Sequence, residues 1–331
     1  MRSTAVGRAA FNLTEYKWGN PQVVRQRAER NYARIVARIQ ATHQRAGWEA
    51  IEREARLRKP VITHALPVMH NRTEEGAVRV YQQGKILPSA LVGMAKRFGT
   101  GHTRSLDKDL ELDRYVFTSF RRDVSFGPVV FVLSNRVLER PDSFVTADDI
   151  SSFMDMDSYD EVLRSKGEGI HSLSSWPGLE KKLAAYSAGV IPGARFIDLL
   201  SLVSVTEFST FEDFVKMLLR GATHYGLSTA GMRCYCLNEQ SEEYRTGHYL
   251  NSAEGKFFGE LDLTLLEEIL VDHPITKEEL IARGLPADLI TVVNDIIDSQ
   301  EERFRLDKNR FSTVYKPQVR GMMRWAELSA K

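Results

Sequence analysis

The sequence predicts an α+β fold, because two blocks of strand-like segments are separated by a long, mostly helical stretch. In the first block, segments rich in apolar, β-branched and aromatic residues occupy 61–69, 113–120 and 129–137. The second block comprises 232–237, 256–258 and 266–271. Between the blocks, residues 148–225 carry apolar residues at helical spacing near 179–186, 196–203 and 211–219.

The first helical segment covers residues 21–59 and predicts either one long helix or a hairpin of two. Pro21 suits a helix start, and apolar residues recur at helical spacing as far as Ile39. Basic side chains outnumber acidic ones here, and we expect Pro60 to end the segment. The basic surface fits a solvated helix face, a contact with nucleic acid or a docking arm for a partner protein.

Further elements follow in order along the chain. We expect a helix over 73–83, capped by Thr73 at its start and closed by Gly84. Segment 129–137 is nearly continuous in apolar residues, which indicates a central strand. Beyond the last strand, helical segments 276–283 and 287–298 predict a compact C-terminal unit similar to part of a winged helix.

Composition narrows the classes of function. The 45 Lys and Arg residues nearly balance the 44 Asp and Glu residues, so net charge does not mark the whole chain as a polyanion binder. Cys234 and Cys236 lack a second Cys or His pair at zinc spacing, so we expect no metal site. No uncharged apolar run approaches the roughly 20 residues that span a bilayer, and the first residues lack the apolar core of a secretion signal. We therefore expect a cytoplasmic protein without a membrane partner.

The most informative stretch is 69–89, where a strand ends in His70 and Asn71-Arg72-Thr73 leads into a short helix. Gly84-Lys-Ile-Leu-Pro-Ser follows that helix. This pattern resembles the opening of the ADP-ribosyltransferase superfamily, in which a strand-end His or Arg holds the ribose of NAD. The resemblance implies that His70, Arg72 and Thr73 bind NAD. His64 competes as the strand histidine, and the spacing to Gly84 favours His70.

A second piece is the strand-like segment 112–120. In the superfamily, the corresponding strand lies behind the nicotinamide ribose and carries aromatic and hydroxyl side chains. The resemblance implies NAD contacts from Tyr115, Phe117, Thr118 and Ser119. Aromatic faces attract a flat cationic ring, and hydroxyl groups can orient a neighbouring carboxylate. An ordinary β-strand has the same composition, so this piece depends on the others.

A third piece is 252–263, where Glu254 begins a strand and a Gly-x-Leu-x-Leu sequence follows. This arrangement resembles the catalytic-glutamate region of the superfamily, and the resemblance implies that Glu254 is the catalytic residue. Glu260 competes, although it falls at an expected turn. Cleavage of the N-glycosidic bond of NAD passes through an oxocarbenium-like sugar, which a carboxylate stabilises. Ser252 replaces the Glu or Gln of arginine-modifying members, so arginine is a doubtful acceptor.

The three pieces occur in the order of the superfamily, which implies its split β-sheet core. On this interpretation, residues 1–60 form a basic helical arm and 61–272 form the catalytic domain, with a helical insertion at about 148–225. Residues 273–331 form a small helical C-terminal unit. NAD is then a substrate, and no metal is required.

The sequence supports two main hypotheses of function. The first is an NAD-dependent ADP-ribosyltransferase similar to the nucleic-acid-modifying toxins of bacterial defence, the DarT-like and CmdT-like enzymes. Its acceptor is a base of RNA or DNA, with a protein as the second choice, and an antitoxin protein is a possible partner. The alternative is a non-enzymatic nucleic-acid-binding regulator with a winged-helix-like tail. A third hypothesis is an RNA phosphotransferase, but the sequence offers no convincing set of phosphate-binding residues for it.

Overall fold

The fold is described from a computed structural model of the 331-residue chain. The described residues are 13–92, 104–120, 127–146, 179–206, 253–271 and 273–292. The predicted helix at 211–219 and strand at 232–237, with Cys234 and Cys236, lie outside these ranges.

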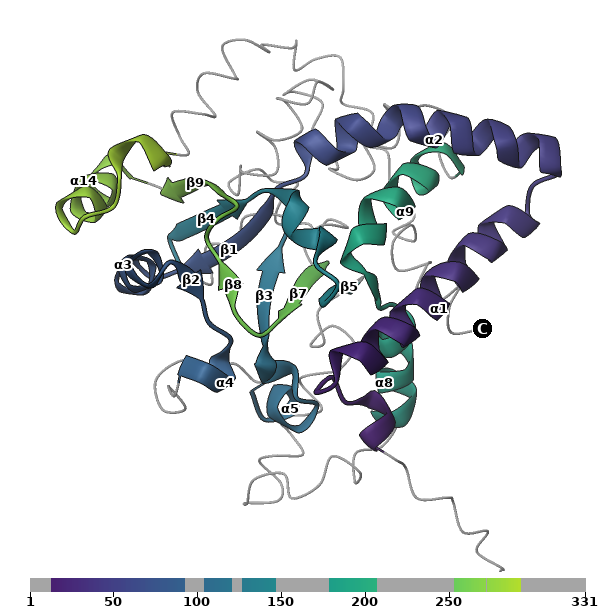
Figure 1. Ribbon diagram of the computed structural model, residues 1–331, viewed down its shortest axis with the longest axis horizontal. Helices are drawn as coiled ribbons and strands as arrows, with labels where there is room; N and C mark the ends of the chain where they lie inside the picture. The colour runs from purple at the N-terminus through teal and green to yellow at the C-terminus, as the bar shows by residue number, and fades with distance from the viewer. Residues whose placement is uncertain are drawn as a thin grey trace, which may run out of the picture.

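A mixed sheet forms the centre of the molecule (Figure 1), which confirms the α+β class. Across the eight-stranded sheet the order is β10-β9-β4-β1-β3-β7-β5-β6. The strands are β1 (Val68–Arg72), β3 (Tyr115–Ser119), β4 (Val129–Leu133), β5 (Ser143–Thr146), β6 (Ile191–Pro192), β7 (Glu254–Phe258), β9 (Leu266–Val271) and β10 (Ile290–Val292). Among the described strands of this sheet, neighbours pair antiparallel, except that β10 and β9 pair in parallel. A separate two-stranded ribbon joins β2 (Lys85–Ile86) to β8 (Leu261–Asp262).

Two groups of helices flank the sheet. In the view of Figure 1, α1 (Pro21–Ala41), α2 (Arg45–Ala65), α8 (Leu179–Ala188) and α9 (Gly193–Thr206) gather on the right, and α3 (Glu74–Gln83) and α14 (Pro274–Ala282) on the left. Shorter helices are α4 (Ser89–Val92) and α5 (Arg104–Asp109), with 3₁₀ turns at Leu13–Tyr16, Leu112–Arg114, Asn135–Glu139 and Ala287–Leu289. Helices α2 and α9 pack along each other, so the predicted insertion and the predicted arm are in contact.

The N-terminal segment is a hairpin of two helices, as one of the two expectations had it. Asn20 caps α1 by accepting from the backbone N–H of Gln22 at 3.0 Å, and Pro21 follows in the first turn. The expected end at Pro60 is wrong, because α2 continues to Ala65 with Pro60 inside it. Tertiary packing explains this, since Ala55 and Ile62 on either side of Pro60 are buried in the core. The strand expected at 61–69 therefore begins only at Val68.

The helix expected at 73–83 is confirmed as α3. The Thr73 hydroxyl accepts from the Gly76 N–H at 3.2 Å, and Gly84 ends the helix with a φ of 66°, where glycine is favoured. The expected strand at 129–137 is shorter, because a 3₁₀ turn begins at Asn135. Its central position is confirmed, since every residue of β4 is buried between β1 and β9.

The C-terminal elements differ from the expectation of a separate helical unit. Helix α14 confirms the first predicted tail helix, but the second, at 287–298, is wrong at Ile290–Val292. These three residues form β10, which pairs in parallel with β9 at the edge of the main sheet. Their β-branched side chains favour a strand, and Ile290 and Val292 are buried there.

The hydrophobic interior has two parts. The larger core lies against the central strands and also includes Ile35 of α1, Ile62 of α2 and Leu280 of α14. A smaller core gathers Trp18, Tyr115, Phe144 and Tyr186 from four distant segments. The predicted division at 60/61 falls inside α2, and residues from all three predicted domains share the larger core. Among the described helices, none is long and apolar enough to cross a membrane.

Candidate functional site

The candidate site lies at the junction of β1 and β3 in the central sheet. These strands share a single register pair, Met69 with Ser119, whereas β1 pairs with β4 and β3 pairs with β7 through five residues each. Continuing the β1–β3 register would place residue 71 opposite residue 117, but that pairing is absent from the register of these two strands. The two strands therefore share less backbone pairing than either shares with its other neighbour.

The His70 side chain takes the place of the missing backbone pairing. Its Nδ1 lies 2.7 Å from the carbonyl oxygen of Phe117, so Nδ1 carries the hydrogen and donates from β1 to β3. Burial, reinforced by the neighbouring Arg72 charge, lowers the pKa of His70 to about 3, so the ring is neutral near pH 7. Nε2 is then an acceptor, and within the described part of the chain this buried atom has no hydrogen-bond partner.

The structure shows which of the two candidate histidines, His64 or His70, lies on a β-strand. His64 lies in α2, one residue before that helix ends at Ala65, and His70 lies on β1. His70 is therefore the histidine on a strand.

Arg72 and Thr73 follow at the end of β1. Burial lowers the pKa of Arg72 to about 10, and this guanidinium has no hydrogen-bond or ion-pair partner among the described residues. Thr73 is the cap of α3, so its hydroxyl already serves the helix. The arginine is the stronger candidate for contact with an anion, because a cation half removed from water favours an oxygen ligand.

The four expected residues of β3 divide between the two faces of the sheet. Phe117 and Ser119 lie opposite Lys256 and Glu254 of β7, and directly opposed residues share a face. Thr118 points to the other face, where its hydroxyl donates to the carbonyl of Gly255 at 3.3 Å. The structure thus brings Phe117 and Ser119 to Glu254 but does not bring Thr118 there.

Tyr115 serves the smaller core. Its side chain is 1% exposed, and its hydroxyl donates to the carbonyl of Trp18 at 2.8 Å. The ring packs edge-on against Trp18 and Phe258, with ring centroids 5.6 and 5.3 Å apart. A ligand ring has no access to Tyr115 in this arrangement, so Phe117 is the aromatic residue of β3 nearest to Glu254.

Glu254 begins β7 and is held by a buried lysine. Lys256 stands two residues further along the same face, its side chain is fully buried, and its Nζ forms an ion pair with the Glu254 carboxylate. The same Nζ donates to the Thr146 hydroxyl at 3.0 Å. The Glu254 side chain keeps 25% of its surface exposed, so the carboxylate reaches the protein surface while its partner does not.

The surroundings of Lys256 hold the lysine charged. Burial alone would lower the pKa of Lys256, but the Glu254 carboxylate outweighs it and raises the pKa above its ordinary value. The ammonium also lies 4.8 Å from the Phe117 ring centroid and 5.7 Å from that of Tyr186. Burial raises the pKa of the Tyr186 hydroxyl, which stays protonated. The result is a fixed carboxylate–ammonium pair framed by two aromatic rings.

Sequence reasoning missed Lys256, Thr146 and Tyr186. The alternation of β7 could have found Lys256, because Glu254 and Lys256 must share a face if 254–258 is a strand. Thr146 and Tyr186 come from segments more than 60 residues away from Glu254, and no local pattern indicates such contacts. Glu260, the competing glutamate, lies after β7 and pairs with Lys85 at 2.7 Å on the surface.

Two comparisons with known proteins bear on the identity of this site. No protein-family model matches the chain, and no curated protein shows significant similarity to it. Among the described residues, no group of three or more His, Cys, Asp or Glu side chains could hold a metal ion.

Proposed function

We propose that the chain is an NAD-dependent ADP-ribosyltransferase that transfers ADP-ribose to a nucleic acid, with Glu254 as its catalytic carboxylate. In this proposal it acts inside a bacterial cell as a toxin or a phage-defence effector, neutralised by an antitoxin protein. The nucleic-acid acceptor, the toxin role and the partner come from the resemblance in sequence.

The observation that carries the proposal is the Nε2 of His70, at the junction of β1 and β3, which has no partner among the described residues. A buried acceptor without a donor costs free energy, and such groups in folded proteins commonly await a ligand or a water. A ribose hydroxyl is a donor of the right kind. The neutral ring, fixed by the Phe117 carbonyl, would hold that hydroxyl without adding charge.

The neighbouring strands supply the remaining chemistry in the proposed reaction. The Glu254 carboxylate stabilises positive charge on the nicotinamide ribose as the C1′–N1 bond breaks. Nicotinamide leaves with the bonding electron pair, a nucleophile of the acceptor bonds to C1′, and the acceptor loses a proton to solvent. Arg72 is placed on the same strand as His70 and would balance phosphate charge.

The deciding experiment is nicotinamide release from NAD by the purified full chain, with added single-stranded DNA, RNA or cell extract. We expect release that depends on one acceptor and is lost in Glu254→Gln. That substitution leaves the buried Lys256 ammonium without its ion-pair partner, which destabilises the fold. The double variant Glu254→Gln/Lys256→Met is therefore needed as a folded inactive form. Glu260→Gln is the matched control, since it removes a surface carboxylate seen in an ion pair with Lys85.

Two outcomes would refute the proposal. A folded wild-type chain that releases no nicotinamide under any condition would exclude the transferase. Loss of release in Glu260→Gln with activity kept in the double variant would move the catalytic carboxylate away from Glu254.

A further inference from the structure

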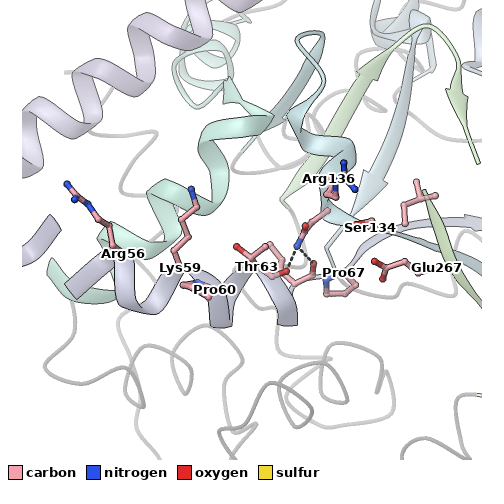
Figure 2. Close-up of a pocket in the computed structure, with 11 residues that line it drawn as sticks. Arg56, Lys59, Pro60, Thr63, Pro67, Ser134, Arg136 and Glu267 are labelled. Carbon is pink, nitrogen blue, oxygen red and sulfur yellow. Dashed lines mark hydrogen bonds between the residues drawn. The ribbon is translucent and has the colours of Figure 1, made fainter. Parts of the chain in front are cut away.

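A pocket separate from His70 and Glu254 opens beside the last turns of α2. Its volume is about 550 Å³, and its walls come from α2, from the turn after β4 and from the start of β9. Figure 2 shows Arg56 and Lys59 of α2 at one end, and Ser134, Arg136 and Glu267 at the other. Nothing in the reaction proposed above uses this pocket.

Positive charge dominates the walls. Arg56, Lys59 and Arg136 face one carboxylate in the lining, Glu267. Lys59 is partly neutralised by Asp198 of α9, whose carboxylate lies 2.6 Å away. Arg56 and Arg136 are exposed and make no ion pair within the described residues. The pocket therefore presents two guanidinium groups that are unpaired within the described part of the chain, and guanidinium is the group best suited to bind phosphate oxygens in pairs.

The floor between these arginines is firm and partly apolar. Pro60 and Pro67 line it, and the Asn135 amide donates to the backbone carbonyls of Thr63 and, at 3.5 Å, of Leu66. This clamp ties the turn after β4 to the end of α2, and the dashed lines in Figure 2 mark it. The exposed ring of Pro60 offers a flat contact for an unpaired base, whereas Pro67 is buried, and a clamped wall loses little entropy when a ligand binds.

We propose that this pocket binds a short segment of single-stranded nucleic acid, with Arg56 and Arg136 on backbone phosphates and a base against Pro60. A duplex fits less well, because its bases are stacked inside and cannot reach a concave floor. The inference rests on the proposed function, since the bound strand is the acceptor of that reaction. Pro67 lines the pocket and precedes His70 by three residues. The bound nucleic acid would therefore lie about 10 Å from His70, measured along the extended main chain.

The test is the affinity of the purified full chain for fluorescently labelled 12-nucleotide single strands of DNA and RNA, measured by anisotropy at several salt concentrations. We expect Arg56→Gln and Arg136→Gln each to weaken binding about 5- to 10-fold at roughly 0.1 M salt. In the double variant Arg56→Gln/Arg136→Gln, the negative slope of log affinity against log salt concentration should become less steep by about 1.4. This is roughly 0.7 for each lost phosphate contact. Lys59→Gln is unsuitable, because it would also break the contact with α9.

Arg45→Gln is the matched control. Arg45 stands on the same helix, 11 residues before Arg56, and its side chain is 94% exposed beside Glu49. Wild-type affinity in Arg45→Gln would support the pocket. Equal loss in Arg45→Gln and Arg56→Gln would overturn it, because the helix would then act only through its overall charge. Equal competition by an acidic decapeptide would also overturn it, since a nucleic-acid site should prefer the strand.

Failure of this inference differs from failure of the proposed function. The inactive double variant Glu254→Gln/Lys256→Met should bind the labelled strand like the wild type, because both residues lie outside the pocket. Strand binding through Arg56 and Arg136 without nicotinamide release would keep the pocket and refute the enzyme. Nicotinamide release without strand binding would keep the enzyme and refute the pocket.

Discussion

At the scale of single residues, the ion pair of Glu254 with Lys256 couples the proposed chemistry to stability. Glu254→Gln leaves a fully buried ammonium without its carboxylate, and we expect a loss of about 2–4 kcal/mol in the free energy of unfolding. Lys256→Met should cost less, about 1–2 kcal/mol, because Glu254 still reaches solvent. Urea unfolding measures both.

The double variant Glu254→Gln/Lys256→Met completes a double-mutant cycle with the two single variants. With both charges removed, we expect its stability to exceed that of Glu254→Gln, because the substituted methionine leaves no buried charge to compensate. A double variant less stable than either single variant would show that the two side chains stabilise the fold independently.

His70 makes a separate prediction about pH. Its folded pKa, about 3, lies below the unfolded value of about 6.5. Between these two pH values His70 is protonated in the unfolded chain and neutral in the folded chain. The free energy of unfolding therefore falls as the pH drops from about 6.5 towards 3. From pH 7 to pH 5 we expect the wild type to lose about 1–2 kcal/mol more than His70→Gln, measured by urea unfolding. Parallel losses in the two proteins would mean that His70 is accessible to protons.

At the scale of elements, the tight packing of β7 against β3 gives a third prediction. A Cβ at Gly255 would lie 2.4 Å from the Thr118 hydroxyl and 3.3 Å from the Phe257 ring. Thr118 is buried and bonded to Gly255, so it cannot move aside easily. We expect Gly255→Ala to lower the melting temperature, at a cost of about 1–3 kcal/mol.

Gly47 of α2 is the matched control for that substitution. Nothing lies within 4 Å of a Cβ built at Gly47, and alanine is the better helix former. Gly47→Ala should therefore stabilise the protein by up to about 1 kcal/mol. Equal effects of the two substitutions on the melting temperature would contradict the close approach of β7 to β3.

Elements were predictable where local signals agree with packing. The cap at Thr73, the αL residue Gly84 and the apolar run of β4 locate α3 and a central strand from the sequence alone. The prediction that Pro60 ends the helix was wrong. Burial of Ile62 favours continuation of α2 past Pro60, although proline disfavours helix. At Ile290–Val292, apolar spacing fitted a helix, but the β-branched side chains and the pairing with the edge of β9 make these residues a strand.

The candidate site was predictable to a similar degree. The resemblance to the superfamily singled out His70, Ser119 and Glu254, and the structure places them on three neighbouring strands. The face on which Thr118 lies, the burial of Tyr115 and the role of Lys256 depend on register and on distant partners. A single sequence without pairing information does not contain them.

At the scale of the whole molecule, the larger core raises the question of which parts can fold alone. The sequence predicts an arm, a catalytic domain and a C-terminal unit divided near residues 60 and 272. In the structure, Ile35 of the predicted arm is buried in the same core as β1 and β4, and so are Leu280 and Ile290 of the predicted C-terminal unit. One shared core favours cooperative folding of all these elements.

The last prediction follows from this shared core. A fragment of residues 61–272 would cut α2 within its length and expose the edge of β9 that β10 covers. We expect this fragment to lack a cooperative unfolding transition and near-ultraviolet circular dichroism, whereas the full chain shows both. The control fragment 13–292 keeps α1, α2 and β10 and should unfold cooperatively. A cooperative transition in 61–272 would instead establish the three-part division, with the basic hairpin as a removable arm.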